Sequence, residues 1–135
     1  KSRLLRVAPK LKFDNWETNF IRRLHESKLC IFDYISTTFL EALSSNIPTV
    51  LFLDESIYPI DDEFFPFFQK FKNVHIFHDN PESAALWVQK VKDDPYEWWL
   101  SESCQEVVKS FCNDYAYSSK SPLKKWKLLL KSFIR

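Results

Sequence analysis

Short apolar runs alternate with longer amphipathic segments through the first part of the chain. Four runs have the length and continuous apolar character of strands buried on both faces, as in a parallel sheet. These runs cover residues 4–8, 29–33, 49–53 and 74–78. Segments of helical length separate them at 15–27, 38–45 and 61–71. The alternation predicts an α/β fold, with a parallel, Rossmann-like sheet flanked by helices.

The remainder of the chain predicts additional helices. Asn80, Pro81 and Glu82 form a helix-start signal, because Asn caps, Pro suits the first turn and Glu favours the helix dipole. This helix is expected to run to about residue 92, followed by helices over 96–115 and 122–134. The simplest expectation for the last helix is that its apolar stripe packs on the sheet or on another domain. The alternative is that its lysines and apolar residues form a surface that binds anionic lipid.

Glycine is absent from the chain. This excludes the glycine-rich phosphate loops of P-loop proteins and of dinucleotide-binding folds. Left-handed backbone positions then go to Asn or Asp, which tolerate them best after Gly. We therefore expect such positions at Asn46, Asn73 and Asn80.

Charge and cysteine content narrow the class of protein. The net charge of +1 excludes sequence-independent nucleic-acid binding, which needs many uncompensated cations. The three cysteines show no metal-ligand spacing, so we expect reduced thiols and a cytoplasmic protein. The chain begins with Lys1 and contains no Met. We expect residues 1–135 to form one domain of a longer, two-domain protein.

The turn between the second predicted strand and the following helix is the main candidate site. Ligands of open parallel sheets bind beyond the carboxyl ends of the strands. The hydroxyls of Ser36, Thr37 and Thr38 and the amides at a helix start suit phosphate oxygens. A structural role explains the same residues, because Thr38 and Glu41 have the spacing of a capping box. Spacing alone favours the capping box.

The segment from Asp33 to Val50 resembles the donor-site helix of glycosyltransferases of the GT-B fold. Thr37-Thr38-Phe39-Leu40-Glu41 and the Asn46-Ile47-Pro48-Thr49 step carry this resemblance. From about Arg6 onward the chain also resembles a family of bacterial transferases of surface-carbohydrate biosynthesis, through segment 73–85, Trp98-Trp99 and segment 111–120. CDP-glycerol-type polymer transferases are more distant relatives. The resemblance implies the C-terminal, donor-binding half of a GT-B protein.

The resemblance also implies roles for individual residues. Ser36, Thr37 and Thr38 would contact the diphosphate of a nucleotide-activated donor, and Glu41 would accept the ribose hydroxyls. Asp33 ends the predicted strand beside them. Independently of the resemblance, the guanidinium of Arg6 suits the leaving diphosphate, and a surface cation beside a strand end explains Arg6 equally well. An N-terminal domain outside this sequence would supply the acceptor site and the catalytic base. No cofactor or metal is expected, and the inner membrane face is an optional partner.

Other polar residues have simpler structural explanations. His75 and His78 are expected to be packed and hydrogen-bonded beside the fourth strand. Asp61, Asp62 and Glu63 favour a helix start, while Asp54 and Glu55 leave donor contact open. Two other functions fit the chain: a non-catalytic protein-interaction domain, or the donor half of a nucleotide-sugar epimerase.

Overall fold

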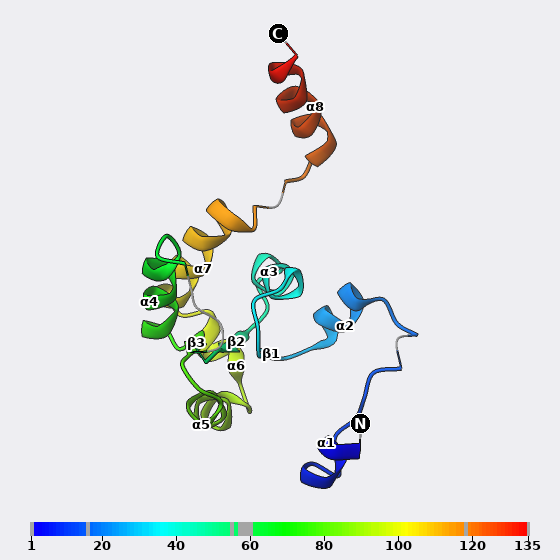
Figure 1. Ribbon diagram of the computed structural model, residues 1–135, viewed down its shortest axis with the longest axis vertical. Helices are drawn as coiled ribbons and strands as arrows, with labels where there is room; N and C mark the ends of the chain where they lie inside the picture. Colours follow the sequence, from blue (N-terminus) through cyan, green and yellow to red (C-terminus); the bar gives the residue numbers. More distant parts are fainter. Residues whose placement is uncertain (1, 16, 55, 57–60, 118, 135) are drawn as a thin grey trace.

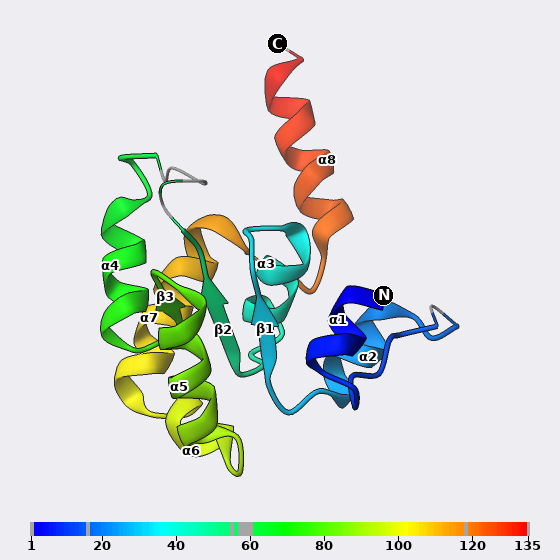
Figure 2. The same cartoon turned by 60° about the horizontal axis from the view of Figure 1, so that its bottom comes forward.

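A three-stranded parallel sheet forms the centre of the computed structural model, which describes all residues except 1, 16, 55, 57–60, 118 and 135. The strands are β1 (Cys30–Phe32), β2 (Thr49–Phe52) and β3 (Phe77–His78), in the order β1-β2-β3. Ile31 pairs with Val50, and Leu51 pairs with Phe77. Figure 2 shows the three strands side by side and pointing the same way. The α/β class and three of the four predicted strands are confirmed.

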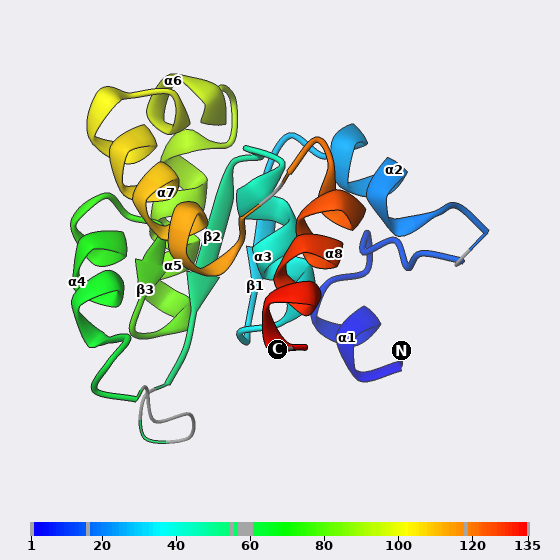
Figure 3. The same ribbon diagram turned by 90° about the horizontal axis from the view of Figure 1, so that it is seen from above.

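Helices account for most of the remaining described residues, and Figure 3 shows them around the strands. They are α1 (Ser2–Val7), α2 (Phe20–Glu26), α3 (Thr37–Ser44), α4 (Phe65–Asn73), α5 (Pro81–Val91), α6 (Pro95–Trp99), α7 (Glu102–Tyr115) and α8 (Pro122–Phe133).

The prediction of a strand over 4–8 is wrong, because these residues lie in or beside the helix α1. The amide of Ala8 donates to the carbonyl of Leu4 at 2.8 Å, which continues the helical pattern. Leu4 and Val7 are 56% and 88% exposed, whereas a strand of a parallel sheet is buried on both faces. An apolar run of five residues does not distinguish a strand from a short helix.

Helices cover the two faces of the sheet unequally. Side chains alternate between the faces along each strand, so Phe32, Leu51 and Phe77 share one face. Helices α3, α4 and α7 pack on this face and enclose the main core, in which Phe71 is fully buried. Helix α5 contacts β2 and β3 from the other face, as Figure 1 shows. That face is open beside β1, where Ile31 is 51% exposed.

The region predicted as one helix over 96–115 contains two. Helix α6 ends at Trp99 and α7 begins at Glu102, with Ser101 as its N-cap residue. The break allows Trp99 to be fully buried while its indole N–H donates to the backbone and side-chain oxygens of Asn46. The contact joins α6 to the turn between α3 and β2.

Two residues of the described chain have left-handed backbones. Asn46 has φ 55° as predicted, but the second is His75 with φ 61°. Asn73 ends α4 and Asn80 is extended, so the predictions for these two residues are wrong. Asn80 instead caps α5, with its side chain accepting from the amide of Ser83 at 2.8 Å.

Helix α8 does not pack on the sheet, so that part of the expectation is wrong, while packing on another domain stays a prediction. It contains no buried residue and projects from the body of the molecule, as Figure 2 shows. Among the described helices, none is long and apolar enough to cross a membrane.

Candidate functional site

The carboxyl ends of the three strands lie at one edge of the sheet, because the strands are parallel. Each strand leads into a different connection there. Strand β1 leads through residues 33–36 into α3, and β3 leads through Asp79 and Asn80 into α5. The predicted site residues Asp33, Ser36, Thr37 and Thr38 therefore belong to this edge, which is uppermost in Figure 2.

Ser36 is the N-cap residue of α3. Its backbone is extended, with φ −141° and ψ 169°, and its Oγ accepts from the amide of Phe39 at 3.3 Å. The same Oγ lies 2.6 Å from the hydroxyl oxygen of Thr38. The predicted capping box of Thr38 and Glu41 is therefore wrong: Thr38 is already helical, and position N3 is held by Phe39.

This correction changes what is available at the start of α3. The amides of Thr37 and Thr38 head the helix, where no carbonyl one turn back can accept them. Thr37 is exposed and Thr38 is half-buried. Glu41 follows them by four and three residues, which places it on the same side of the helix. Within the described structure, no hydrogen bond or ion pair occupies its half-buried carboxylate.

Two further carboxylates follow the other strands. Asp54, after β2, accepts from the amide and the hydroxyl of Ser56, and these two bonds hold the pKa of its carboxyl below the ordinary value. Asp79, after β3, forms an ion pair with Lys72 of α4. Asp79 is not among the predicted site residues, although it directly follows an apolar run, which is the available signal. Glu55 lies outside the described residues.

Arg6 is not brought to this edge. It lies on α1 and is exposed. Figure 1 shows α1 at the lower end of the molecule, well apart from α3. Because residues 4–8 do not form a strand of the sheet, nothing places Arg6 at a strand end, and its predicted role stays a prediction.

Of the two histidines near β3, His78 is buried and hydrogen-bonded as predicted, whereas His75 is exposed and its ring makes no hydrogen bond within the described residues. His78 is 6% exposed; its Nδ1 lies 2.7 Å from Ser83 Oγ, and its Nε2 lies 3.1 Å from the carbonyl oxygen of His75. The ring of His75 stacks on Trp87 at 3.8 Å. Burial lowers the pKa of His78, with Asp79 opposing, and burial together with Lys90 lowers the pKa of His75. These contacts fit a structural role for His78.

The cysteines are poor nucleophiles in this environment. Cys104 is fully buried, and burial raises the pKa of its thiol to about 12. Burial also raises the thiol pKa values of Cys30 and Cys112. Reactivity requires the thiolate, which a raised pKa suppresses. No group of His, Cys, Asp and Glu within the described residues could hold a metal ion.

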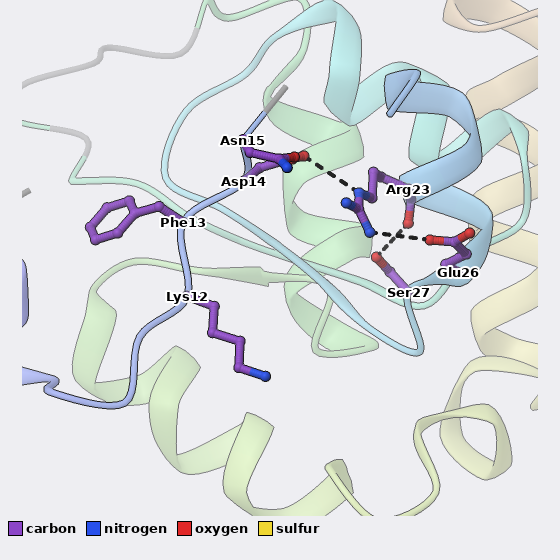
Figure 4. A pocket seen from close by; sticks show the side chains of 7 residues that line it. All are labelled: Lys12, Phe13, Asp14, Asn15, Arg23, Glu26 and Ser27. Carbon is purple, nitrogen blue, oxygen red and sulfur yellow. Dashed lines mark hydrogen bonds and ion pairs between the residues drawn. The ribbon is translucent and has the colours of Figure 1, made fainter. Parts of the chain in front are cut away.

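A recess lies elsewhere on the described surface, between α2 and the segment before it. Its volume is about 670 Å³, and Figure 4 shows its lining side chains, which are Lys12, Phe13, Asp14, Asn15, Arg23, Glu26 and Ser27. Arg23 lies between two carboxylates, 3.7 Å from Asp14 and 3.5 Å from Glu26. Its charge is thus compensated within the protein, which leaves Lys12 as the other cation of the lining.

The fold places the chain in the class of α/β proteins with a parallel sheet. Proteins of this class generally bind ligands at the carboxyl edge of the sheet. The chain matches the sequence model of the LIC12162 family transferase over residues 1–130. It therefore belongs to the LIC12162 family of transferases. No curated protein and no solved structure matches the chain significantly.

Proposed function

We propose that this chain is the donor-binding part of its transferase and holds the diphosphate of a nucleotide-activated donor at the start of α3. One observation carries the proposal: α3 begins directly beyond the carboxyl end of β1, and within the described residues the amides of Thr37 and Thr38 at its start donate to no other group. Amides, hydroxyls and the positive end of the helix dipole together favour phosphate oxygens.

Glu41 supplies the second half of the proposed site. Its carboxylate lies one turn along the same side of α3 and is not used for capping. A carboxylate accepts two hydroxyl donors, which suits the ribose of a nucleotide. Asp33, exposed beside the turn, is a second acceptor for donor hydroxyls. Phosphate groups at the amides and sugar hydroxyls at the carboxylates give each part of the donor a partner of matching chemistry.

The proposed reaction follows from the sequence resemblance and the family together. A GT-B-like enzyme would transfer a glycosyl or glycerophosphoryl group to a surface carbohydrate, with the nucleotide as leaving group. Another part of the protein would supply the acceptor and the catalytic base. In this proposal Ser36 to Thr38 stabilise the negative charge that develops on the leaving group, which is the usual contribution of preorganised donors.

Calorimetric titration of the chain with CDP, UDP and GDP tests the site. We expect one of them to bind, and we expect Thr37→Val and Glu41→Gln each to weaken that binding about tenfold, the value of one charge-assisted hydrogen bond. Ser44→Ala is the matched control, because it removes a hydroxyl from the far end of the same helix. It should leave the affinity unchanged.

The alternative of a non-catalytic interaction domain makes a different prediction. In that case no nucleotide binds, and the Thr37 and Glu41 variants leave the activity of the complete transferase unchanged. Either result, with unfolding of the variants like that of the parent chain, would refute the proposed site. Binding that the Ser44 variant weakens as much as Thr37→Val would also count against it.

A further inference from the structure

Helix α8 presents an apolar surface that nothing in the described chain covers. Every residue from 121 to 134 is exposed, including Leu123 at 84%, Trp126 at 61% and Phe133 at 75%. Figure 1 shows α8 beyond α7 and separated from the sheet. Its first turn is held by Lys125, whose ammonium lies 4.4 Å from the ring centre of Tyr117. The helix is thus attached at one end and open along its length.

The exposed residues of α8 are divided between two sides. With 3.6 residues per turn, the largest apolar side chains occupy roughly a third of the helix circumference; they are Leu123, Trp126, Leu129, Leu130 and Phe133. Lys124, Lys127 and Lys131 lie on the opposite side. Leu128 lies among these lysines and is the exception. The helix is therefore amphipathic, with a cationic polar side.

Charge is distributed unevenly between this helix and the rest of the chain. Residues 118–135 contain six of the nineteen Lys and Arg and none of the eighteen Asp and Glu, so the remaining residues carry a net charge of −5. An anionic surface would attract α8 and repel the body of the protein. A partner with such a surface would therefore approach the molecule through α8.

We propose that α8 binds the surface of an anionic lipid bilayer, lying in the interface with Trp126 and Phe133 toward the acyl chains. A cationic side opposite an apolar stripe, with an aromatic residue at its centre, matches the chemistry of the membrane–water interface. Nucleic acid would use the lysines but leave the apolar side exposed. This proposal does not depend on the proposed donor site.

Co-sedimentation of the chain with vesicles tests the proposal. We expect binding to vesicles of equimolar phosphatidylglycerol and phosphatidylcholine, weaker binding as salt is added, and little binding to phosphatidylcholine alone. Replacing Lys124, Lys127 and Lys131 with Gln should lower the affinity about a hundredfold, since each lysine near an anionic surface contributes roughly fivefold. Trp126→Ser combined with Phe133→Ser should abolish binding.

Matched controls separate α8 from the rest of the molecule. Replacing Lys28, Lys92 and Lys109 with Gln removes the same charge from the body, and Leu86→Ser removes an exposed leucine from α5. Both should leave vesicle binding unchanged. Because α8 has no buried residue, its variants should unfold at the temperature of the parent chain.

Three results would overturn the proposal. One is no binding to anionic vesicles at low salt, and another is equal binding by the α8 variants and the parent chain. The third is self-association in sedimentation velocity that the Trp126 and Phe133 changes abolish while vesicles leave the protein in solution. That result would assign α8 to a second copy of the chain.

Discussion

Ser36 takes part in two interactions that together define the start of α3. Its Oγ accepts the amide of Phe39 and lies within hydrogen-bond distance of Thr38 Oγ1. Three consecutive hydroxyl residues occur here, and each can cap a helix, so the sequence does not identify the cap. The extended backbone of Ser36 identifies it as the cap, because an N-cap residue has a non-helical conformation.

Loss of the cap should destabilise the protein measurably. We expect Ser36→Ala to lower the free energy of unfolding by about 1 kcal/mol, the usual cost of removing an N-cap side chain. Thr37→Ala is the control, because Thr37 is exposed and is not the cap. It should change the free energy by less than about 0.5 kcal/mol in urea unfolding without nucleotide. Equal losses in the two variants would contradict the assignment of Ser36 as the cap.

At the scale of elements, the alternating pattern predicted the strands of the sheet but not the exposed first run. Helices cover both faces at β2 and β3, and β1 is correct although it is covered on one face only. The first run is exposed and helical, so its apolar character carries no information about a sheet. The break between α6 and α7 lacks Gly or Pro. It follows from tertiary packing of Trp99, which is not visible in local sequence.

Helix α4 provides a test of this distinction between buried and exposed positions. Phe71 is fully buried and lies 6.4 Å from Phe39 and 4.8 Å from Phe111, measured between ring centres. We expect Phe71→Ala to lower the free energy of unfolding by about 3–5 kcal/mol, through lost apolar burial and the cavity left behind.

Phe65 is the matched control on the same helix, because it is 46% exposed. Phe65→Ala should cost less than about 1 kcal/mol in the same urea unfolding experiment. Similar losses for the two substitutions would show that α4 does not bury Phe71 against α3 and α7 as described.

At the scale of the whole molecule, the predicted site is only partly assembled. The strand–turn–helix at residues 33–38 was predictable, because it depends on local sequence and on the parallel sheet. The separation of Arg6 from that turn was not predictable, since it depends on whether the first apolar run joins the sheet as a strand. Asp54 and Asp79 lie at the same edge because each follows a strand of the parallel sheet, whereas the order of the strands within the sheet is not specified by one sequence.

The lowered pKa values of two histidines make the stability of the whole molecule depend on pH. The folded-state pKa values of His75 and His78 lie below the ordinary 6.5, so the unfolded chain takes up protons first as pH falls. Their contribution to stability is present above the unfolded pKa and is lost as pH falls through the folded values. We expect the free energy of unfolding to decrease between about pH 7.5 and 5, where carboxylates contribute little.

Urea unfolding of two variants isolates the histidine effect. His78→Gln should flatten the pH dependence, whatever its effect on absolute stability, whereas His25→Gln should not, because His25 is exposed on α2. A pH dependence that is the same in the His78 variant and the parent chain would refute the assignment.

The two left-handed residues have a consequence for the unfolded chain. Glycine would adopt the left-handed backbone of these positions without steric cost. Asn46 and His75 adopt it at a steric cost of about 1–2 kcal/mol each. A chain of this length with ordinary composition would contain about nine glycines. Each replacement of glycine at a compatible position narrows the unfolded ensemble and stabilises the fold by about 0.4–1 kcal/mol. Summed over the glycines that the chain lacks, the stabilisation from a narrower unfolded ensemble is therefore similar to, or larger than, the strain energy at Asn46 and His75.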